Sequence, residues 1–139
     1  MRYLCVAAVL LAAGCGSSSP RLTGKPITRT EWKAVFSDWY AHGRDLHGHS
    51  CGAMVIAIAH LPVDPPMYST IYADLSGYAG KVCTKHPRYD RIARGMSDED
   101  VAALAGMPRR SGPRCWLYTE RRVCFTNERA SIIQRVVHG

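Results

Sequence analysis

The sequence lacks any apolar run long enough to cross a membrane as a helix. Its longest such run covers residues 3–13, whereas a spanning helix needs about 20 residues. A multi-pass membrane protein is therefore excluded. Internal repeats are also absent, and the composition is not that of a disordered chain, because 47% of the residues are hydrophobic and 21% are charged. With 139 residues the chain has the size of one folded domain.

The N-terminal residues have the pattern of an export signal. Arg2 precedes the apolar run 3–13, which contains Cys5, and small residues follow up to Cys15. Residues 11–14, Leu-Ala-Ala-Gly, together with Cys15 and the Gly/Ser stretch after it, resemble the lipobox of bacterial lipoproteins. The resemblance implies cleavage before Cys15 and acylation of its thiol, which anchors a protein to a bilayer. The alternative is an ordinary secretory signal with a free thiol nearby.

These features divide the chain into three parts. Residues 1–14 are predicted to be a lipoprotein signal peptide, and residues 15–25 the lipidated cysteine and a flexible Ser/Gly/Pro-rich tether. Residues 26–139 are predicted to form one domain, with a helical part at 26–90. The expected location is the cell membrane or outer membrane, with the domain facing the periplasm or the exterior. The first expected partner is the lipid bilayer, bound through acylated Cys15.

Four cysteines follow the tether: Cys51, Cys83, Cys115 and Cys124. An even number in an exported chain favours disulfides, and four cysteines allow three connectivities. Cys115 and Cys124 flank residues 119–120 symmetrically, so a hairpin centred there places them opposite each other at a non-hydrogen-bonded site. We therefore predict the disulfides Cys115–Cys124 and Cys51–Cys83.

A first helix is predicted after residue 28. Thr28 with Glu31 forms a capping box, and Ile27 with Trp32 fits a hydrophobic staple. The apolar positions that recur at helical spacing are Trp32, Val35, Phe36, Trp39 and Tyr40. They predict one broad aromatic face buried in the core. An exposed stripe that binds a partner is the alternative.

Two more helices are predicted before the middle of the chain. Residues 51–60 are apolar and rich in alanine, which favours a short buried helix ended by Pro62, although a strand is the alternative over that length. Asp64 as N-cap, with Pro65 at the first helical position, opens a longer helix that leads to Cys83.

The last part of the chain combines a helix with strands. Ser97 caps a short helix with an acidic first turn, which ends at Gly106. Strands are predicted near residues 114–118, 122–126 and 130–137, with tight connections at 119–120 and 127–128. The predicted fold class is α+β, in which N-terminal helices pack on a C-terminal three-stranded antiparallel sheet, share one core with it and are held by two disulfides.

The C-terminal third also carries an ordered set of residues: Gly95, Met96, Ser97, Val101, Leu104, Gly106, Pro108, Trp116, Tyr118, Val123, Phe125 and Asn127. This order resembles the SmpA/OmlA, or BamE-like, family of small bacterial lipoproteins. For residues 91–139 the resemblance implies a helix that leads through a Gly-x-Pro stop into a three-stranded sheet. It also implies a role as an accessory subunit of envelope assembly. It brings no catalytic residues.

Two alternatives place chemistry near Cys51. His42, His47, His49 and His60 lie near it in sequence, and imidazoles with a thiolate bind zinc or copper. Their spacing matches no recognised ligand set, and Cys51 is assigned to a disulfide, so we predict surface histidines and neither a metal nor another cofactor.

A cysteine at the start of an apolar helix also resembles the nucleophile of papain-like peptidases, because a helix N-terminus lowers the pKa of a thiol. The histidines available as its base are His60, His86 and His138, and none lies in a recognisable motif. A cysteine enzyme that uses Cys51 is therefore the weaker alternative, and we predict that the protein is not an enzyme.

Basic residues after position 90 are all arginines. The predicted binding surface consists of Arg109, Arg110, Arg114, Arg121 and Arg122, with Arg129 and Arg135 in the same region. Guanidinium groups suit the phosphates of anionic lipid headgroups or acidic partners. Because the chain is exported, nucleic acid is not an expected partner. The alternative is a solvated polar face without a partner.

Together these patterns predict a non-enzymatic, membrane-anchored envelope lipoprotein that binds or modulates another envelope component, with a protein of the cell envelope as the expected partner. An alternative from a different class is a phage- or prophage-encoded lipoprotein that blocks superinfection.

Overall fold

The computed structural model describes residues 20–62 and 65–138. The predicted signal peptide, Cys15 and the predicted Asp64 cap lie outside the described residues. The helices, in chain order, are α1 (Arg29–His42), α2 (Cys51–Ala59), α3 (Pro65–Val82), the short 3-10 helix η1 (Tyr89–Arg91) and α4 (Asp98–Ala105). The strands are β1 (Arg110–Ser111), β2 (Cys115–Leu117), β3 (Arg121–Thr126) and β4 (Arg129–Arg135). This order confirms the α+β class. Within the described ranges, no helix is both long and apolar enough to cross a membrane.

Helix α1 begins at the predicted capping box. The Thr28 side chain accepts a hydrogen bond from the Glu31 backbone N–H, and the Glu31 carboxylate accepts one from the Thr28 N–H. The aromatic face is narrower than predicted, because Tyr40 is 76% exposed. Trp39 makes the contact with α3 by donating its indole N–H to Asp74 over 2.9 Å, and Tyr40 only packs edge-on against Trp39.

Helix α2 is the centre of the helical part, and it is a helix rather than the alternative strand. Ser50 caps it by accepting a hydrogen bond from the Ala53 N–H. It packs against α1, α3, α4 and β1, and most of its residues are buried. Small residues permit this crowding: a Cβ at Gly52 would lie only 3.1 Å from the Cα of Glu99 on α4.

The predicted disulfide Cys51–Cys83 is confirmed. It joins the start of α2 to the residue after α3, with a Cα–Cα distance of 4.8 Å. The loop that it closes has a sequence separation of 32 residues. In the loop-entropy account, a bridge of this span stabilises the folded state by about 4 kcal/mol.

The sheet has four strands in the order β1-β2-β3-β4, all antiparallel, where three were predicted. The missed strand is β1, which pairs Arg110 with Leu117 and Ser111 with Trp116. Its two residues are too few to show an alternating pattern, and Gly112 and Pro113 follow at once.

The two predicted tight connections are present. Asn127 and Glu128 both have positive φ, at 49° and 62°, as the two-residue turn between β3 and β4 requires. The connection at residues 119–120 sets Cys115 opposite Cys124, and the predicted disulfide between them is confirmed with a Cα–Cα distance of 4.0 Å. A bulge between Cys124 and Phe125 shifts the register of β3 on β4.

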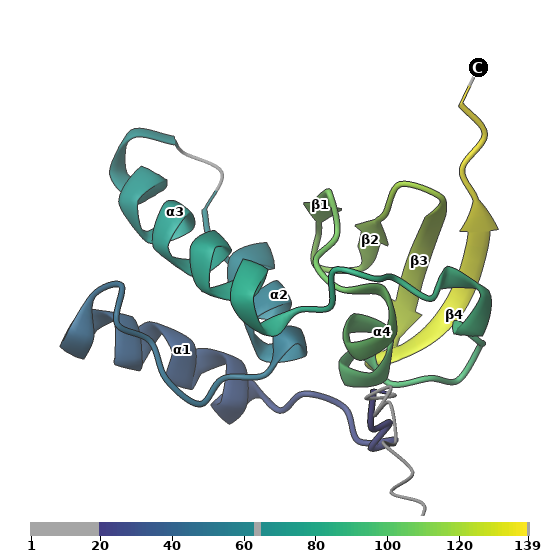
Figure 1. Ribbon diagram of the computed structural model, residues 1–139, viewed down its shortest axis with the longest axis horizontal. Helices are drawn as coiled ribbons and strands as arrows, with labels where there is room; N and C mark the ends of the chain where they lie inside the picture. The colour runs from purple at the N-terminus through teal and green to yellow at the C-terminus, as the bar shows by residue number, and fades with distance from the viewer. Residues whose placement is uncertain (1–19, 63–64, 139) are drawn as a thin grey trace, which may run out of the picture.

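Helices and sheet share one hydrophobic core, as predicted. Figure 1 shows α1, α2 and α3 on one side of the molecule and the strands on the other, with α4 against the sheet. Trp116, Tyr118 and Val123 supply large buried side chains from the sheet, and Val101 and Met54 do so from the helices.

Residues 20–28, which we name the strap, bind to the start of α4. The Thr23 and Gly24 N–H groups donate to the two carboxylate oxygens of Asp100 over 2.7 and 2.8 Å, and the Ile27 N–H donates to Asp98 over 2.9 Å. Arg129 donates to the Gly24 carbonyl oxygen. Thr23 and Gly24 belong to the predicted tether, yet these bonds attach them to the domain.

Candidate functional site

The arginines of the predicted binding surface do not form one group. Four of the five gather with Arg135 at the end of the sheet where β2 turns into β3, and we name this group the basic end: Arg109, Arg110, Arg121, Arg122 and Arg135. The fifth, Arg114, precedes β2 and lies at the opposite end of the sheet. Of the five arginines predicted as the surface, Arg114 therefore lies apart, whereas Arg135, predicted in the same region, lies with the other four.

The strand register places four arginines of the basic end at neighbouring paired positions of the sheet. Arg121 lies directly opposite Arg135. On the next rung Arg110 pairs with Leu117, and Leu117 pairs with Arg122. Residues that oppose each other share a face of the sheet and successive residues alternate, so Arg110 and Arg122 lie on one face and Arg121 and Arg135 on the other.

In the part of the chain that the structure describes, none of the five guanidinium groups of the basic end forms an ion pair with a carboxylate. Arg121 donates to the backbone carbonyl oxygen of Glu120 over 3.1 Å, and Arg122 lies 3.9 Å from the Cys115 sulfur. Like charges directly opposite on neighbouring strands destabilise a sheet. The pair Arg121 and Arg135 is thus a cost to folding that a bound anion would relieve.

Apolar side chains are exposed on β4 and just beyond its end. Val137 is 84% exposed and Ile132 is 46% exposed. His138 lies beside Val137, with its Nε2 atom 2.8 Å from the Thr119 carbonyl oxygen. The surface therefore presents cations next to hydrophobic groups. Guanidinium groups in this setting bind phosphate or carboxylate oxygens in pairs of parallel hydrogen bonds.

Arg114 belongs to a different feature, a groove of about 910 Å³ between the helices and the sheet. Trp32 stacks on His60 at one side, with ring centroids 4.1 Å apart. Trp116 and Phe125 pack on each other at the other side, with centroids 4.5 Å apart. The groove therefore offers aromatic faces and the guanidinium groups of Arg114 and Arg29 to a planar or apolar group.

The histidines near Cys51 separate into two places. His42 and His49 contact the two carboxylate oxygens of Asp38 at 2.8 and 2.7 Å, whereas His60 lies in the groove. The His47 backbone N–H donates to Asp38. This bond, followed by that of the His49 side chain, lowers the pKa of Asp38 to about 2. Across residues 20–62 and 65–138, no group of three His, Cys, Asp or Glu side chains is arranged to hold a metal ion.

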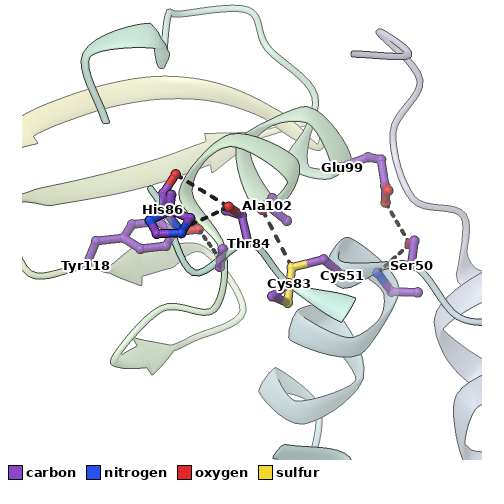
Figure 2. The surroundings of a disulfide bond; sticks show 10 residues. Ser50, Cys51, Cys83, Thr84, His86, Glu99, Ala102 and Tyr118 are labelled. Atoms are coloured by element: carbon purple, nitrogen blue, oxygen red, sulfur yellow. Dashed lines mark hydrogen bonds between the residues drawn. A yellow bond between two sulfur atoms is a disulfide. The ribbon is translucent and has the colours of Figure 1, made fainter. Parts of the chain in front are cut away.

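The sulfur of Cys51 is bonded to Cys83 and lies 3.5 Å from the carbonyl oxygen of Ala102 (Figure 2). The disulfide therefore occupies the atom that a papain-like mechanism needs as a thiolate. Beside it, the Ser50 hydroxyl donates to the Glu99 carboxylate over 2.9 Å. Burial raises the pKa of Glu99, and the bond from Ser50 opposes this effect.

The sequence did not reveal the role of the acidic first turn of α4. From the sequence, these carboxylates are predicted only to complement the helix dipole. In the structure, Asp98 and Asp100 are buried and accept hydrogen bonds from the strap. The available signal was the position of three acidic residues just after a cap, but their partners lie more than 70 residues away along the chain.

The resemblance of residues 91–139 to the SmpA/OmlA family remains a prediction from sequence pattern. No family model, no curated protein and no solved structure matches the chain.

Proposed function

We propose that the protein is a non-enzymatic envelope lipoprotein, anchored to a membrane through acylated Cys15, whose folded domain binds another component of the cell envelope. The observation that carries the proposal is the basic end, where Arg121 faces Arg135 without a described carboxylate partner. Cations that oppose each other in the folded state and remain accessible to water are suited to capture an anionic group.

The disulfides support an exported protein. Four cysteines are consumed in two bridges, and such bridges form and persist in oxidising compartments. The strap supports anchoring, because its hydrogen bonds to Asp98 and Asp100 would connect a lipidated N-terminus firmly to the domain.

Binding is favoured over catalysis by the chemistry of the basic end. It offers exposed guanidinium groups, which stay protonated in proteins and so serve poorly as acids or bases. A cysteine nucleophile is not available at Cys51 while the disulfide is intact. The same arginines are well suited to hold an anion in place.

The anchor is tested by expressing the full chain in a bacterial host with an azide-labelled palmitate analogue. We expect the wild type to carry the label and to remain with the membrane fraction, and Cys15→Ala to lose both. A Cys15→Ala protein that keeps the label would contradict the proposed anchor.

The binding surface is tested with a photo-crosslinking amino acid at position 122 of the anchored protein. We expect discrete crosslinks to an envelope component, which disappear in the double variant Arg121→Glu/Arg135→Glu. The matched control, Arg44→Glu/Lys85→Glu, changes the net charge equally at exposed positions outside the basic end and is expected to keep them. Equal crosslinking in both variants would refute a role for the basic end.

A further inference from the structure

The basic end and the strap lie at opposite ends of the sheet. Strand β4 begins at Arg129, which donates to Gly24 of the strap, and ends at Arg135 of the basic end. Seven residues of strand separate the two ends by about 20 Å. In Figure 1 the purple strap lies below α4, whereas yellow β4 runs upward to the C-terminus.

The strap fixes where the chain leaves the domain. Asp100 binds two consecutive N–H groups, one on each carboxylate oxygen, and Asp98 binds a third. A chain that leads from this point to an anchor at Cys15 holds the strap end toward the anchoring membrane. The basic end then points away from that membrane.

The chemistry of the basic end matches a phospholipid surface. Its guanidinium groups suit phosphate oxygens, and each basic residue near an anionic bilayer contributes to attraction. Exposed apolar side chains lie near these arginines. Ile132 shares a face of the sheet with Arg122, because Cys124 pairs with Ile132 and Arg122 pairs with Gln134. Val137 follows Arg135, two residues beyond the end of β4. Apolar groups beside cations favour insertion at a lipid interface over contact with a soluble polyanion.

We propose that the basic end docks on an anionic phospholipid surface other than the leaflet that holds the anchor, so that the protein bridges two lipid surfaces. The inference rests on the proposed function for its anchor at Cys15. It goes beyond that function in naming the partner, phosphate-bearing lipid, and in placing it opposite the anchoring membrane.

The test uses residues 15–139, which include every described residue and the whole core. With four cysteines in disulfides, Cys15 is the free thiol of this chain and couples to a maleimide lipid in neutral phosphatidylcholine vesicles. Heavy, sucrose-loaded vesicles that contain phosphatidylglycerol are then added, and fluorescence of the coupled vesicles in the pellet measures bridging.

We expect bridging with the wild type and its loss at high salt. Arg121→Glu/Arg135→Glu is expected to reduce the apparent affinity at least about 20-fold, from the contribution of each basic residue near an anionic surface. Arg110→Glu/Arg122→Glu provides a second variant should the first fail to form its disulfides. Arg44→Glu/Lys85→Glu is expected to bridge like the wild type.

Four results would overturn the inference. The first two are no bridging by the wild type and equal bridging by the basic-end variants and the control. The third is that the domain binds lipid only when phosphatidylglycerol is placed in the vesicle to which the protein is coupled. The fourth is binding of free polyphosphate without binding of vesicles. Failure of natural lipidation at Cys15 would refute the proposed anchor alone, because the bridging assay uses a chemical one.

Discussion

Charged side chains differ in burial and in hydrogen bonding between the two ends of the sheet, the strap end and the basic end. At the strap end, Asp98 and Asp100 are buried, and their oxygens accept hydrogen bonds from backbone N–H groups. At the basic end, the arginines are mostly exposed and Arg121 opposes Arg135. Buried carboxyl groups that accept backbone hydrogen bonds fix the strap to the domain, whereas exposed charges of one sign that repel each other add no stability. We therefore assign a role in stability to the strap end and a role in binding to the basic end.

The largest effect on stability is expected from removing the disulfides, which stabilise the fold covalently rather than through charge. Cys51→Ala/Cys83→Ala should lower the free energy of unfolding by about 4 kcal/mol, and Cys115→Ala/Cys124→Ala by about 3 kcal/mol, because the first bridge closes the longer loop. Urea unfolding of the oxidised domain measures both values. A greater loss from the Cys115–Cys124 variant would contradict the loop-length account.

The next effect tests the strap end directly. Asp100→Ala leaves the Thr23 and Gly24 N–H groups without their acceptor and should cost about 3 kcal/mol of unfolding free energy, since each bond to a charged group contributes about 1.5 kcal/mol or more. Asp100→Asn, which keeps one acceptor oxygen, should cost less. A loss below about 1 kcal/mol for Asp100→Ala would show that the strap is not bound in solution.

The pH dependence should also distinguish the two ends. Burial raises the pKa of Asp98 above its usual value of 3.8, so the folded state binds this proton more readily than the unfolded state. The stability from Asp98 therefore rises as the pH falls from its folded pKa toward 3.8, by about 1.4 kcal/mol for each unit of pKa difference. Urea unfolding between pH 7 and pH 4 should show the wild type gaining stability relative to Asp98→Asn. Arg121→Gln leaves Asp98 and its hydrogen bonds in place, so it should follow the wild type over this pH range.

Asp38 is a control, because its pKa is shifted in the opposite direction from that of Asp98. The pKa of Asp38 is lowered to about 2, so its contribution is present above pH 3.8 and is lost as the pH falls toward 2. Asp38→Asn should therefore approach the stability of the wild type only in strong acid. A constant difference between the two proteins from pH 7 to pH 2 would contradict the hydrogen bonds to His47 and His49.

The smallest effect on stability is expected at the basic end. Arg121→Gln removes one of two opposed charges and should raise the free energy of unfolding by about 0.5 kcal/mol. The matched control, Arg44→Gln, should change it by less. Thermal unfolding at low ionic strength resolves the difference, and adding salt should abolish it. Destabilisation by Arg121→Gln would show that this arginine holds the fold together.

Local signals made much of the fold predictable. The capping box at Thr28, Pro65 at the start of α3 and the symmetry of Cys115 and Cys124 about a turn each depend on residues close in sequence. The structure confirms these features. The pairing of Cys51 with Cys83 then followed by elimination.

The site depended on features that local patterns do not encode. The turn at Asn127 and Glu128 alone would pair Arg121 with Gln134, and only the bulge between Cys124 and Phe125 brings Arg121 opposite Arg135. The sequence contains no glycine at the bulge to reveal it. The strap was also unpredictable, since it joins Thr23 to Asp100 across the whole domain. Both features depend on tertiary contacts rather than on propensity.

One measurement tests the assignment of binding to the basic end most directly. The double variant Arg121→Glu/Arg135→Glu is assayed in parallel for urea unfolding and for binding to phosphatidylglycerol vesicles. Because the variant replaces two opposed cations with two opposed carboxylates, we predict a free energy of unfolding equal to that of the wild type. We also predict a loss of vesicle binding that Arg44→Glu/Lys85→Glu does not share. A variant that unfolds more easily, or that binds vesicles as the wild type does, would contradict the account.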